Sequence, residues 1–505
     1  MFNRSESLAI VSILLLAGGI LIWGYNRAKP YGKVGLFAWL QSVVLMVPWL
    51  IFFGLFTTGI YLNLIGIIGL LVLSTGIYIY LGNRLRAVGN EEAIEERHRA
   101  ASQINPTEAK TDDFRPPNAA PQTNSPPAAP EILPIPEEDI KAIQDIFGID
   151  TFFTTETISY QEGAIFKGNL RGEPAEVHAR LSQKLQSRLA DKYRLFLVES
   201  PEGKPVVIVL PSSNGPQPLS LVQKNLAVVL LVATLATSIE AAALLLGFDW
   251  FSELGRYAEA LPVAAGLWLI LAAHEIGHWW LARRNDVRLS LPFFIPSWQI
   301  GSFGALTRFQ SLLPNRSVLL DIALAGPAAG GIVSLAMLVV GLILSHPGSV
   351  FQLPTQFFQG SVLVGVLAKT VLGDALQTPT LDVHPLVVLG WLGLTITALN
   401  LMPAGQLDGG RMIQAIYGRK TARRTTIATL VVLAIVAIAI PNNPIPLYWG
   451  IIILFLQRDL ERPSLNELTE PNDTRAVLAL VALFLMLAML IPLSPALAGR
   501  LGIGI

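Results

Sequence analysis

The apolar segment from residue 259 to residue 282 constrains this chain most, because it is long enough to cross a lipid bilayer and yet contains ionisable residues. At about 20 residues per span, it predicts a transmembrane helix. His274, Glu275 and His278 lie within it in the order HExxH. Ionisable side chains are costly inside a membrane and usually serve a function there. A set of polar residues satisfied inside a helix bundle is the structural alternative.

The spacing of this motif suits a zinc ion. Residues four apart lie on one face of a helix, so His274 and His278 can both direct a ring nitrogen at one Zn²⁺. Glu275 lies beside them and can act as a general base. The motif therefore indicates metal-assisted hydrolysis.

A catalytic zinc needs a third protein ligand and an open position for water. No glutamate occurs between Glu275 and Glu461, and no histidine follows the motif closely, so thermolysin-type enzymes and metzincins fit poorly. Asp408 is the most prominent candidate, because it ends a long charge-free run and precedes two glycines that let the backbone bend. The other candidates are Asp286, Asp321, Asp374, Asp382, Asp459, His346 and His384.

The sequence HEIGH, followed much later by Asn400-Leu-Met-Pro-Ala-Gly-Gln-Leu-Asp408-Gly-Gly, resembles the site-2 protease family of intramembrane zinc metalloproteases, peptidase family M50. The resemblance implies that His274, His278 and Asp408 hold zinc and that Glu275 activates the bound water. It also implies that Asn400 helps to stabilise the transition state. On the residues alone, a polar contact between packed helices is the alternative for Asn400.

Composition supports a membrane location for most of the chain. Hydrophobic residues make up 52% and charged residues 14%, against about 25% charged residues in soluble domains. We therefore expect an all-α polytopic membrane protein of about ten transmembrane helices, plus a small soluble α+β domain. The formal net charge is zero, which argues against a nucleic-acid partner. The absence of cysteine excludes disulfides and thiolate zinc ligands.

The first 83 residues are predicted to form three transmembrane helices. One corresponds to residues 8 to 25, and the charge-free run from 34 to 83 is long enough for two more. A signal peptide is the alternative for the first, but Glu6 offsets Arg4 and no small-residue cleavage pattern follows. Residues 84 to 136 are charged and then rich in proline, which predicts a disordered linker.

Residues 137 to 214 are predicted to form the soluble α+β domain. We expect, in order, a helix at 137 to 147, a strand at 151 to 166, a helix at 174 to 193, and a hairpin of 194 to 198 with 205 to 210.

This domain contains the sequence Gly168-Asn169-Leu170-Arg171. A Gly-Asn-Leu-Arg element ahead of the membrane core resembles the plant chloroplast and cyanobacterial branch of the family, named for gravitropism-deficient, yellow-green mutants. Cyanobacterial members would lack a transit peptide, as we expect of this chain. On the residues alone, a turn followed by a helix-entry arginine is favoured.

The catalytic membrane core is predicted at residues 220 to 425 and further transmembrane helices at 426 to 505. Residues 351 to 372 are predicted to be either re-entrant or interfacial, and a pair of short spans is predicted on the two sides of residue 441. The expected spans are 222 to 247, 259 to 282, 322 to 345, 385 to 403, 425 to 440, 444 to 457 and 476 to 493.

The positive-inside rule predicts the orientation. Arginines and lysines collect in alternate connections, such as the one that begins with Arg283 and Arg284, and we expect these to be cytoplasmic. The zinc site would then lie within the membrane, nearer the cytoplasmic face. The membrane itself is either the plasma membrane or the thylakoid.

Two segments are predicted to support the site. Residues 289 to 309 contain Pro292 and Pro296, so they fit an apolar β-loop, which resembles the membrane-embedded sheet proposed in the family to pair with extended substrate. A folded interfacial loop without substrate contact is the alternative. Residues 326 to 331 are rich in glycine and should pack closely against the 259 to 282 helix. The expected substrate-binding residues are Gly301, Ser302, Phe303, Gly304 and Ala305.

We therefore expect an intramembrane zinc endopeptidase in the lipid bilayer that cleaves transmembrane or membrane-anchored proteins, with the α+β domain governing access. A non-proteolytic scaffold or chaperone of the same fold is the alternative. Zinc transport is a third hypothesis, which leaves Glu275 without a task. The sequence specifies neither the substrate nor the oligomeric state.

Overall fold

Helix α7 (Tyr257–Arg284), which carries the HExxH sequence, packs between α6 (Leu221–Leu245) and α8 (Arg316–Leu344). The computed structural model describes residue 19, residues 21 to 57, scattered positions between 69 and 84, and residues 135 to 503 except 161, 201, 299 and 442. The chain divides into two units, one on each side of residue 126.

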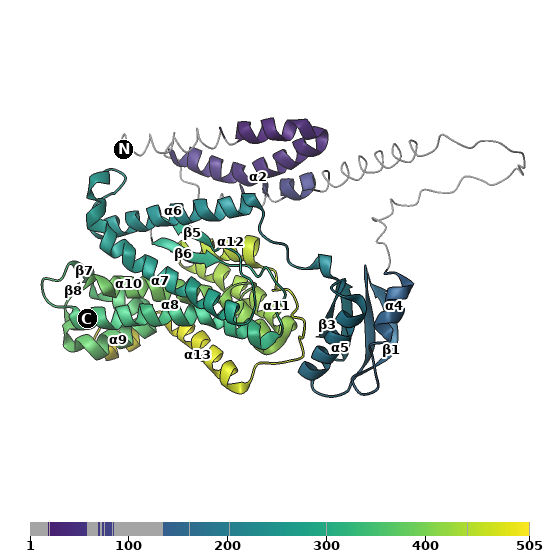
Figure 1. Cartoon of the computed structure of the whole chain (residues 1–505). Coiled ribbons are helices and arrows are strands. Elements are labelled where there is room, and N and C mark those ends of the chain that lie inside the picture. Colours follow the sequence, from purple (N-terminus) through teal and green to yellow (C-terminus); the bar gives the residue numbers. More distant parts are fainter. Residues whose placement is uncertain are drawn as a thin grey trace, which may run out of the picture. The chain divides into compact units, whose positions relative to one another are not determined.

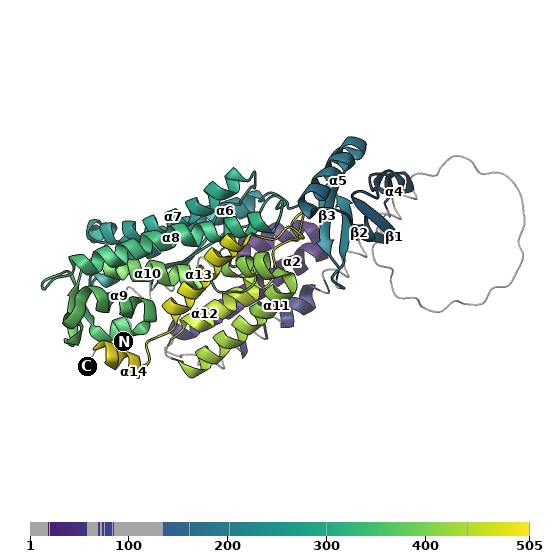
Figure 2. The same ribbon diagram turned by 90° about the horizontal axis from the view of Figure 1, so that it is seen from below.

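The membrane core consists of long apolar helices that lie alongside one another. Helix α10 (Pro385–Asn400) and helix α7 both pack against α8, as Figure 2 shows. Helix α13 (Asp473–Leu490) crosses α10. The described residues contain five helices that are long and apolar enough to cross a membrane: Gln223–Leu245, Leu254–Arg284, Arg316–Leu344, Asp408–Ala439 and Asp473–Leu490.

Local sequence explains where these helices begin. Ser220 and Gln223 form a capping box at the start of α6, in which each side chain bonds the backbone of the other. The side chain of Asn315 accepts a hydrogen bond from the N–H of Val318 at the start of α8. His384 accepts one from the N–H of Leu386 at the start of α10. The predicted spans at 222, 259, 322 and 476 therefore correspond closely to α6, α7, α8 and α13.

The span predicted at 425 to 440 lies within a longer helix whose first part was not predicted. Helix α11 (Asp408–Ala439) already begins at Asp408 and contains a break at Gly418, where φ is 78°. Polar residues in its first part obscured the helix in the sequence. Helix α12 (Ile445–Ile452) and a π-helical turn (Ile453–Gln457) follow. Helix α10 has 16 residues, fewer than the predicted 385 to 403 span, because the chain turns away before Pro403.

Residues 351 to 372, for which the sequence allowed either a re-entrant or an interfacial segment, form several short elements. They contain strand β7 (Phe351–Pro354), the 3₁₀ turn Thr355–Gly360 and the short helix α9 (Val362–Leu372). A second 3₁₀ turn (Gly373–Gln377) and strand β8 (Thr380–Val383) follow, and β8 pairs antiparallel with β7. The chain ends with the short helix α14 (Pro495–Leu501).

A two-stranded hairpin lies beside α6 within the core. Strands β5 (Phe293–Ser297) and β6 (Gly301–Leu306) pair antiparallel, with Phe294 opposite Ala305. Figure 1 shows the hairpin beside α6 and near α12. The hydroxyl of Thr237 in α6 donates to the carbonyl of Gly301 at 2.6 Å, so helix and hairpin are joined at the hairpin turn.

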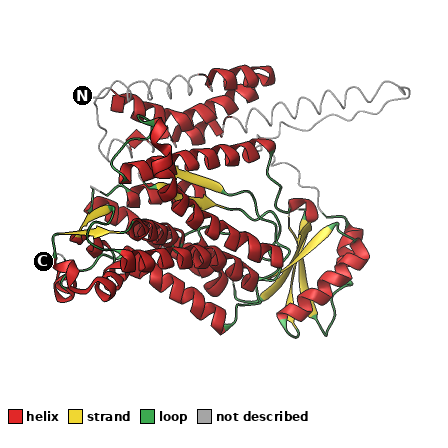
Figure 3. Cartoon of the chain, turned by 60° about the vertical axis from the view of Figure 1, so that its left-hand side comes forward, coloured by secondary structure: helices red, strands yellow, loops and turns green. Residues whose placement is uncertain are grey.

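The soluble domain is a four-stranded antiparallel sheet with one face covered by helix α5 (Pro174–Leu189), as Figure 3 shows. The strand order is β1 (Phe152–Tyr160), β2 (Gly163–Leu170), β4 (Pro205–Pro211) and β3 (Tyr193–Glu199). Helix α4 (Glu137–Gln144) contributes Ile143 to the same core.

The hairpin of β3 and β4 was predicted correctly, whereas the single strand predicted at 151 to 166 is two strands, β1 and β2. The turn between them was not recognised. The Gly168 element is the end of β2 and not the expected turn, and the side chains of Asn169 and Arg171 are exposed.

Residues 458 to 472, called here the connecting segment, join the soluble domain to the membrane core. Leu197 in β3 donates its N–H to the carbonyl of Leu465 at 2.8 Å and accepts from the N–H of Glu467 at 2.9 Å. Leu465 in turn donates to the carbonyl of Leu313, just before α8, at 2.9 Å. The segment therefore covers one edge of the sheet and is attached to the core at the same residues.

The first unit is described mainly by helix α2 (Gly32–Thr57). The predicted span at 8 to 25 lies mostly outside the described residues, as does much of residues 58 to 83. The predicted linker at 84 to 136 lies outside them almost entirely. The three N-terminal spans and the linker stay predictions.

Gly168 lies where β1 bulges between Thr154 and Glu156, and a methyl group there would come within 2.1 Å of the carbonyl oxygen of Phe153. We expect Gly168→Ala to destabilise the soluble domain by about 1–3 kcal/mol, because backbone must move to admit the methyl group. Hydrogen exchange of the β1 and β2 amides in the full chain measures this.

Asn169→Ala is the control, because that side chain is exposed and should change stability by less than about 0.5 kcal/mol. Equal amide protection in the two variants would contradict the structural explanation of Gly168.

Candidate metal centre

His274, His278 and Asp408 converge although Asp408 lies on a different helix. The two Nε2 atoms are 3.1 Å apart, and each lies 3.3 Å from Oδ2 of Asp408. Ligands bound about 2.0–2.1 Å from a tetrahedral zinc lie roughly 3.3 Å from one another. Among the described residues, this is the one group of three or more such side chains whose ligand atoms are this close. The three residues therefore fit a zinc ion.

The ring orientation of His278 is fixed by helix α8. Its Nδ1–H donates to the carbonyl of Ile322 at 2.7 Å, because a carbonyl oxygen can only accept. That tautomer leaves a lone pair on Nε2 for a metal. Gly326 makes room for the ring, since a methyl group there would lie 2.2 Å from Nε2. The predicted close packing of the 326 to 331 segment on the HExxH helix is confirmed.

Asp408 is positioned by a tight loop after α10. The helix ends at Asn400, and α11 begins at Asp408. Gly409 lies so close to the end of α10 that a methyl group on it would come within 1.8 Å of the carbonyl oxygen of Leu401. Gly405 has φ of 50°, which lets the loop between the helices reverse direction.

Glu275 is half-buried, one residue from His274, and is held by the hairpin. The hydroxyl of Thr307, directly after β6, donates to Oε2 of Glu275 at 2.8 Å. The other carboxylate oxygen has no hydrogen bond to any described side chain, so it is free to accept a proton.

A buried arginine adjoins the three ligand residues. Nη1 of Arg411 is 3.7 Å from Oδ1 of Asp408, and its Nε donates to Oε2 of Glu461 at 3.1 Å. Arg411 and Glu461 are both buried. When Asp408, Glu461 and Glu275 are ionised, Arg411 balances only one of the three negative charges. A divalent cation would balance the other two, which is a second reason why the residues fit zinc.

Asn400 lies beside the hairpin and close to the candidate ligands. Its Nδ2 donates to the carbonyl of Ile396 at 2.9 Å, which uses one of the two N–H bonds. The amide packs against Gly304, where a methyl group would come within 2.7 Å of Nδ2. Asn400, His278 and Asp408 line a cavity of about 10 Å³. That volume is close to the smallest that holds one water molecule.

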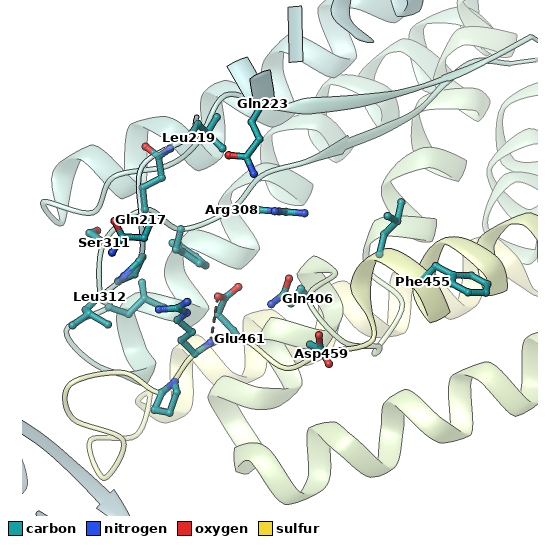
Figure 4. A pocket seen from close by; sticks show the side chains of 17 residues that line it. Gln217, Leu219, Gln223, Arg308, Ser311, Leu312, Gln406, Phe455, Asp459 and Glu461 are labelled. Atoms are coloured by element: carbon teal, nitrogen blue, oxygen red, sulfur yellow. Dashed lines mark hydrogen bonds between the residues drawn. The ribbon is translucent and has the colours of Figure 1, made fainter. Parts of the chain in front are cut away.

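A much larger cavity of about 520 Å³ lies next to this small one, and Gln406 lines both. Figure 4 shows Arg308, Gln406 and Glu461 reaching toward the same space. Its walls come from the linker after the soluble domain, the loop after the hairpin and the connecting segment. The small cavity at the candidate metal ligands thus adjoins a polar space on the side of the soluble domain.

Several of the alternative third ligands have other partners. Asp321 bonds Nε of Arg475 at 2.8 Å, and Asp382 accepts from the N–H of Gly348 at 2.8 Å. Asp374 pairs with Lys369, and Asp459 pairs with Arg458. His346 bonds the carbonyl of Pro347, and His384 caps α10. Asp286, with φ of 55°, ends the turn after α7.

The predicted substrate-binding residues 301 to 305 form most of β6, and Ser302 is fully buried. Both strands of the hairpin contact α6, and β6 also contacts α10.

Sequence reasoning missed Thr307, Arg411 and Glu461. Arg411 did carry a signal, because it is a charged residue three positions after Asp408, just beyond a long charge-free run. Thr307 and Glu461 carried none, since their roles depend on contacts between distant segments.

Comparison with known proteins agrees with these observations. Residues 141–218 match the family "EGY3 middle domain", and residues 262–440 match "Peptidase family M50". The probable zinc metalloprotease EGY1, chloroplastic, of Arabidopsis thaliana is 36% identical over 412 residues, which is 73% of each chain. The probable zinc metalloprotease EGY2, chloroplastic, of the same plant is 37% identical over 377 residues, which cover 72% of this chain and 67% of that protein.

Rice (Oryza sativa subsp. japonica) has an EGY1 of the same description that is 35% identical over 411 residues, or 73% of this chain and 70% of that protein. No solved structure matches the chain. Both family matches, the membrane-length helices and the three-ligand cluster support the same family assignment. This chain belongs to the site-2 protease family, peptidase family M50, in its EGY branch, and is a multi-pass membrane zinc metalloprotease.

Proposed function

We propose that this protein is an intramembrane endopeptidase in which His274, His278 and Asp408 hold the zinc ion. It cleaves transmembrane or membrane-anchored proteins near the cytoplasmic side of the bilayer. The observation that carries the proposal is the buried cluster of the three ligand atoms, 3.1–3.3 Å apart, beside Glu275. The proposed site residues lie on membrane-length apolar helices, which favours substrates within the bilayer.

Each proposed site residue has a different role in the reaction. When bound, zinc supplies a Lewis acid that polarises the scissile carbonyl and lowers the pKa of water. The free carboxylate oxygen of Glu275 accepts a proton from water as the water oxygen bonds to the carbonyl carbon. Glu275 then returns that proton to the amide nitrogen as the C–N bond breaks. The second N–H of Asn400 donates to the developing oxyanion.

The peptide must reach this site in extended form, because a helix hides its carbonyl groups. We propose that Gly301 to Ala305 in β6 hold it by strand pairing within the membrane. Helix α6 contacts both strands of the hairpin and Thr237 bonds the carbonyl of Gly301, so we expect binding to separate α6 from the hairpin at Gly301.

The soluble domain is proposed to control access to the site. The connecting segment supports this role, because Glu467 binds the domain and Glu461 binds Arg411 beside Asp408. The names of both Arabidopsis relatives include the word chloroplastic. We therefore place this protein in a thylakoid-type membrane rather than the plasma membrane.

The ligand assignment is tested by elemental analysis of the purified protein. We expect one zinc per chain in the wild type and a large loss in Asp408→Ala, because two histidines alone bind zinc weakly. Asp374→Ala, whose carboxylate is exposed and pairs with Lys369, is the control and should keep its zinc. Undiminished zinc in Asp408→Ala would mean that another residue is the third ligand.

The role of Glu275 is tested by Glu275→Gln, which preserves size but removes the base. Cleavage of a designed transmembrane reporter in proteoliposomes should fall by about 10²–10⁴-fold, with zinc content unchanged. A variant that still cleaves would contradict the assignment. A wild type that binds zinc and cleaves no reporter would favour the scaffold alternative.

Control by the soluble domain is tested at Glu467. Glu467→Pro removes the N–H that bonds Leu197, whereas Glu467→Ala removes only the side chain and is the matched control. One backbone bond contributes about 1 kcal/mol, so the undocked fraction should rise roughly fivefold in the proline variant. We expect faster proteolysis of the linker at 212 to 220 and faster cleavage of a reporter with a bulky soluble domain. Equal rates in both variants would contradict the proposal.

A further inference from the structure

Thr307 connects the hairpin to Glu275. It directly follows β6, and its hydroxyl donates to Oε2 of Glu275 at 2.8 Å. Glu275 lies on α7, so the bond joins two elements that are separate in the sequence. A hydroxyl has one proton to donate, and here it goes to the carboxylate. The other oxygen of Glu275 has no hydrogen bond to any described side chain and is available to a water molecule.

The backbone of Thr307 is itself held in place. Nη2 of Arg411 donates to the carbonyl of Thr307 at 2.8 Å. The same guanidinium contacts Asp408 and Glu461 and lies over the ring of Phe309, 4.8 Å from its centre. A planar guanidinium with several fixed donors can hold these groups together, whereas a lysine ammonium cannot reproduce the geometry. Thr307 therefore cannot shift without disturbing a buried ionic cluster.

We propose that Thr307 is a positioning residue, which orients the Glu275 carboxylate for proton transfer, and that Arg411 fixes Thr307 for this purpose. The inference rests on the proposed function of Glu275. A glutamate side chain has three rotatable bonds, so an unheld carboxylate would spend much of its time turned away from the water. A bonded oxygen removes that freedom before the substrate arrives.

The position of Thr307 gives the bond a second consequence. Thr307 continues the strand on which the substrate is proposed to pair, so a movement of the hairpin moves the partner of the base. Orientation of Glu275 then depends on whether the hairpin is in its proper place.

The test compares side chains of similar size that differ in the hydroxyl. In Thr307→Val the hydroxyl is lost and the shape is kept. We expect kcat for the transmembrane reporter to fall roughly tenfold to a hundredfold, the effect of losing one hydrogen bond to a charged group. KM and zinc content should stay at wild-type values. Thr307→Ser keeps the hydroxyl and should restore most of kcat.

Thr395→Val is the control for removing a threonine hydroxyl in the membrane. That hydroxyl donates to the carbonyl of Trp391 in its own helix at 2.8 Å, and its removal should leave kcat unchanged. If Thr307→Val loses zinc because the valine packs badly, Thr307→Ala and Thr307→Ser repeat the comparison, since both lack the methyl group. Equal kcat in Ala and Ser variants would overturn the inference, as would wild-type kcat in the valine variant.

The outcomes separate this inference from the proposed function. If Glu275→Gln still cleaves the reporter, the assignment of the base fails. If Glu275→Gln is inactive and Thr307→Val is fully active, only the positioning role fails. Arg411→Lys adds a further readout: we expect it to lower both kcat and zinc content, because Arg411 contacts Thr307 and Asp408. Wild-type kcat in Arg411→Lys would contradict the role of Arg411.

Discussion

The contact between His278 and helix α8 is the constraint on which the rest of the candidate site depends. The carbonyl of Ile322 fixes the ring, and Gly326 leaves the space that the ring occupies. Without a side chain at Gly326, α7 and α8 can approach until the backbone of one helix bonds the imidazole of the other. Asp408 then reaches the two histidines only because the loop after Asn400 packs tightly enough to place the first turn of α11 beside them.

Burial makes this arrangement sensitive to charge. Asp408, Arg411 and Glu461 are all buried among apolar helices, where an unpaired charge is costly. Their mutual contacts reduce that cost, and a bound divalent cation would complete the balance. The metal is thus expected to contribute to the stability of the core as well as to its chemistry. The proposed ligands and the residues behind them form one electrostatic unit.

Much of the site could be predicted because its strongest signals are local. The four-residue spacing of His274 and His278 needs only helix periodicity, and Asp408 stood out against an apolar background. Four helices were predicted close to their observed positions for the same reason, because a long apolar run in the sequence directly indicates a membrane-spanning helix. Thr307 and Glu461 could not be found in this way, because their roles depend on contacts between separate segments, and the local signal of Arg411 was overlooked. The start of α11 was missed because polar residues there masked the pattern, and the β1 to β2 turn was missed although polar residues and a glycine mark it in the sequence.

In a crowded bilayer, the small cavity at the proposed ligands would affect which neighbouring proteins are cleaved. A space of about 10 Å³ is too small for a peptide, so a substrate would have to widen it before reaching the proposed ligands. Discrimination among neighbours would therefore fall mainly on the step that opens the core, before any bond is cut. A protease of this kind could share a membrane with abundant transmembrane helices and leave them intact, because the space at its proposed ligands admits none of them until the core opens.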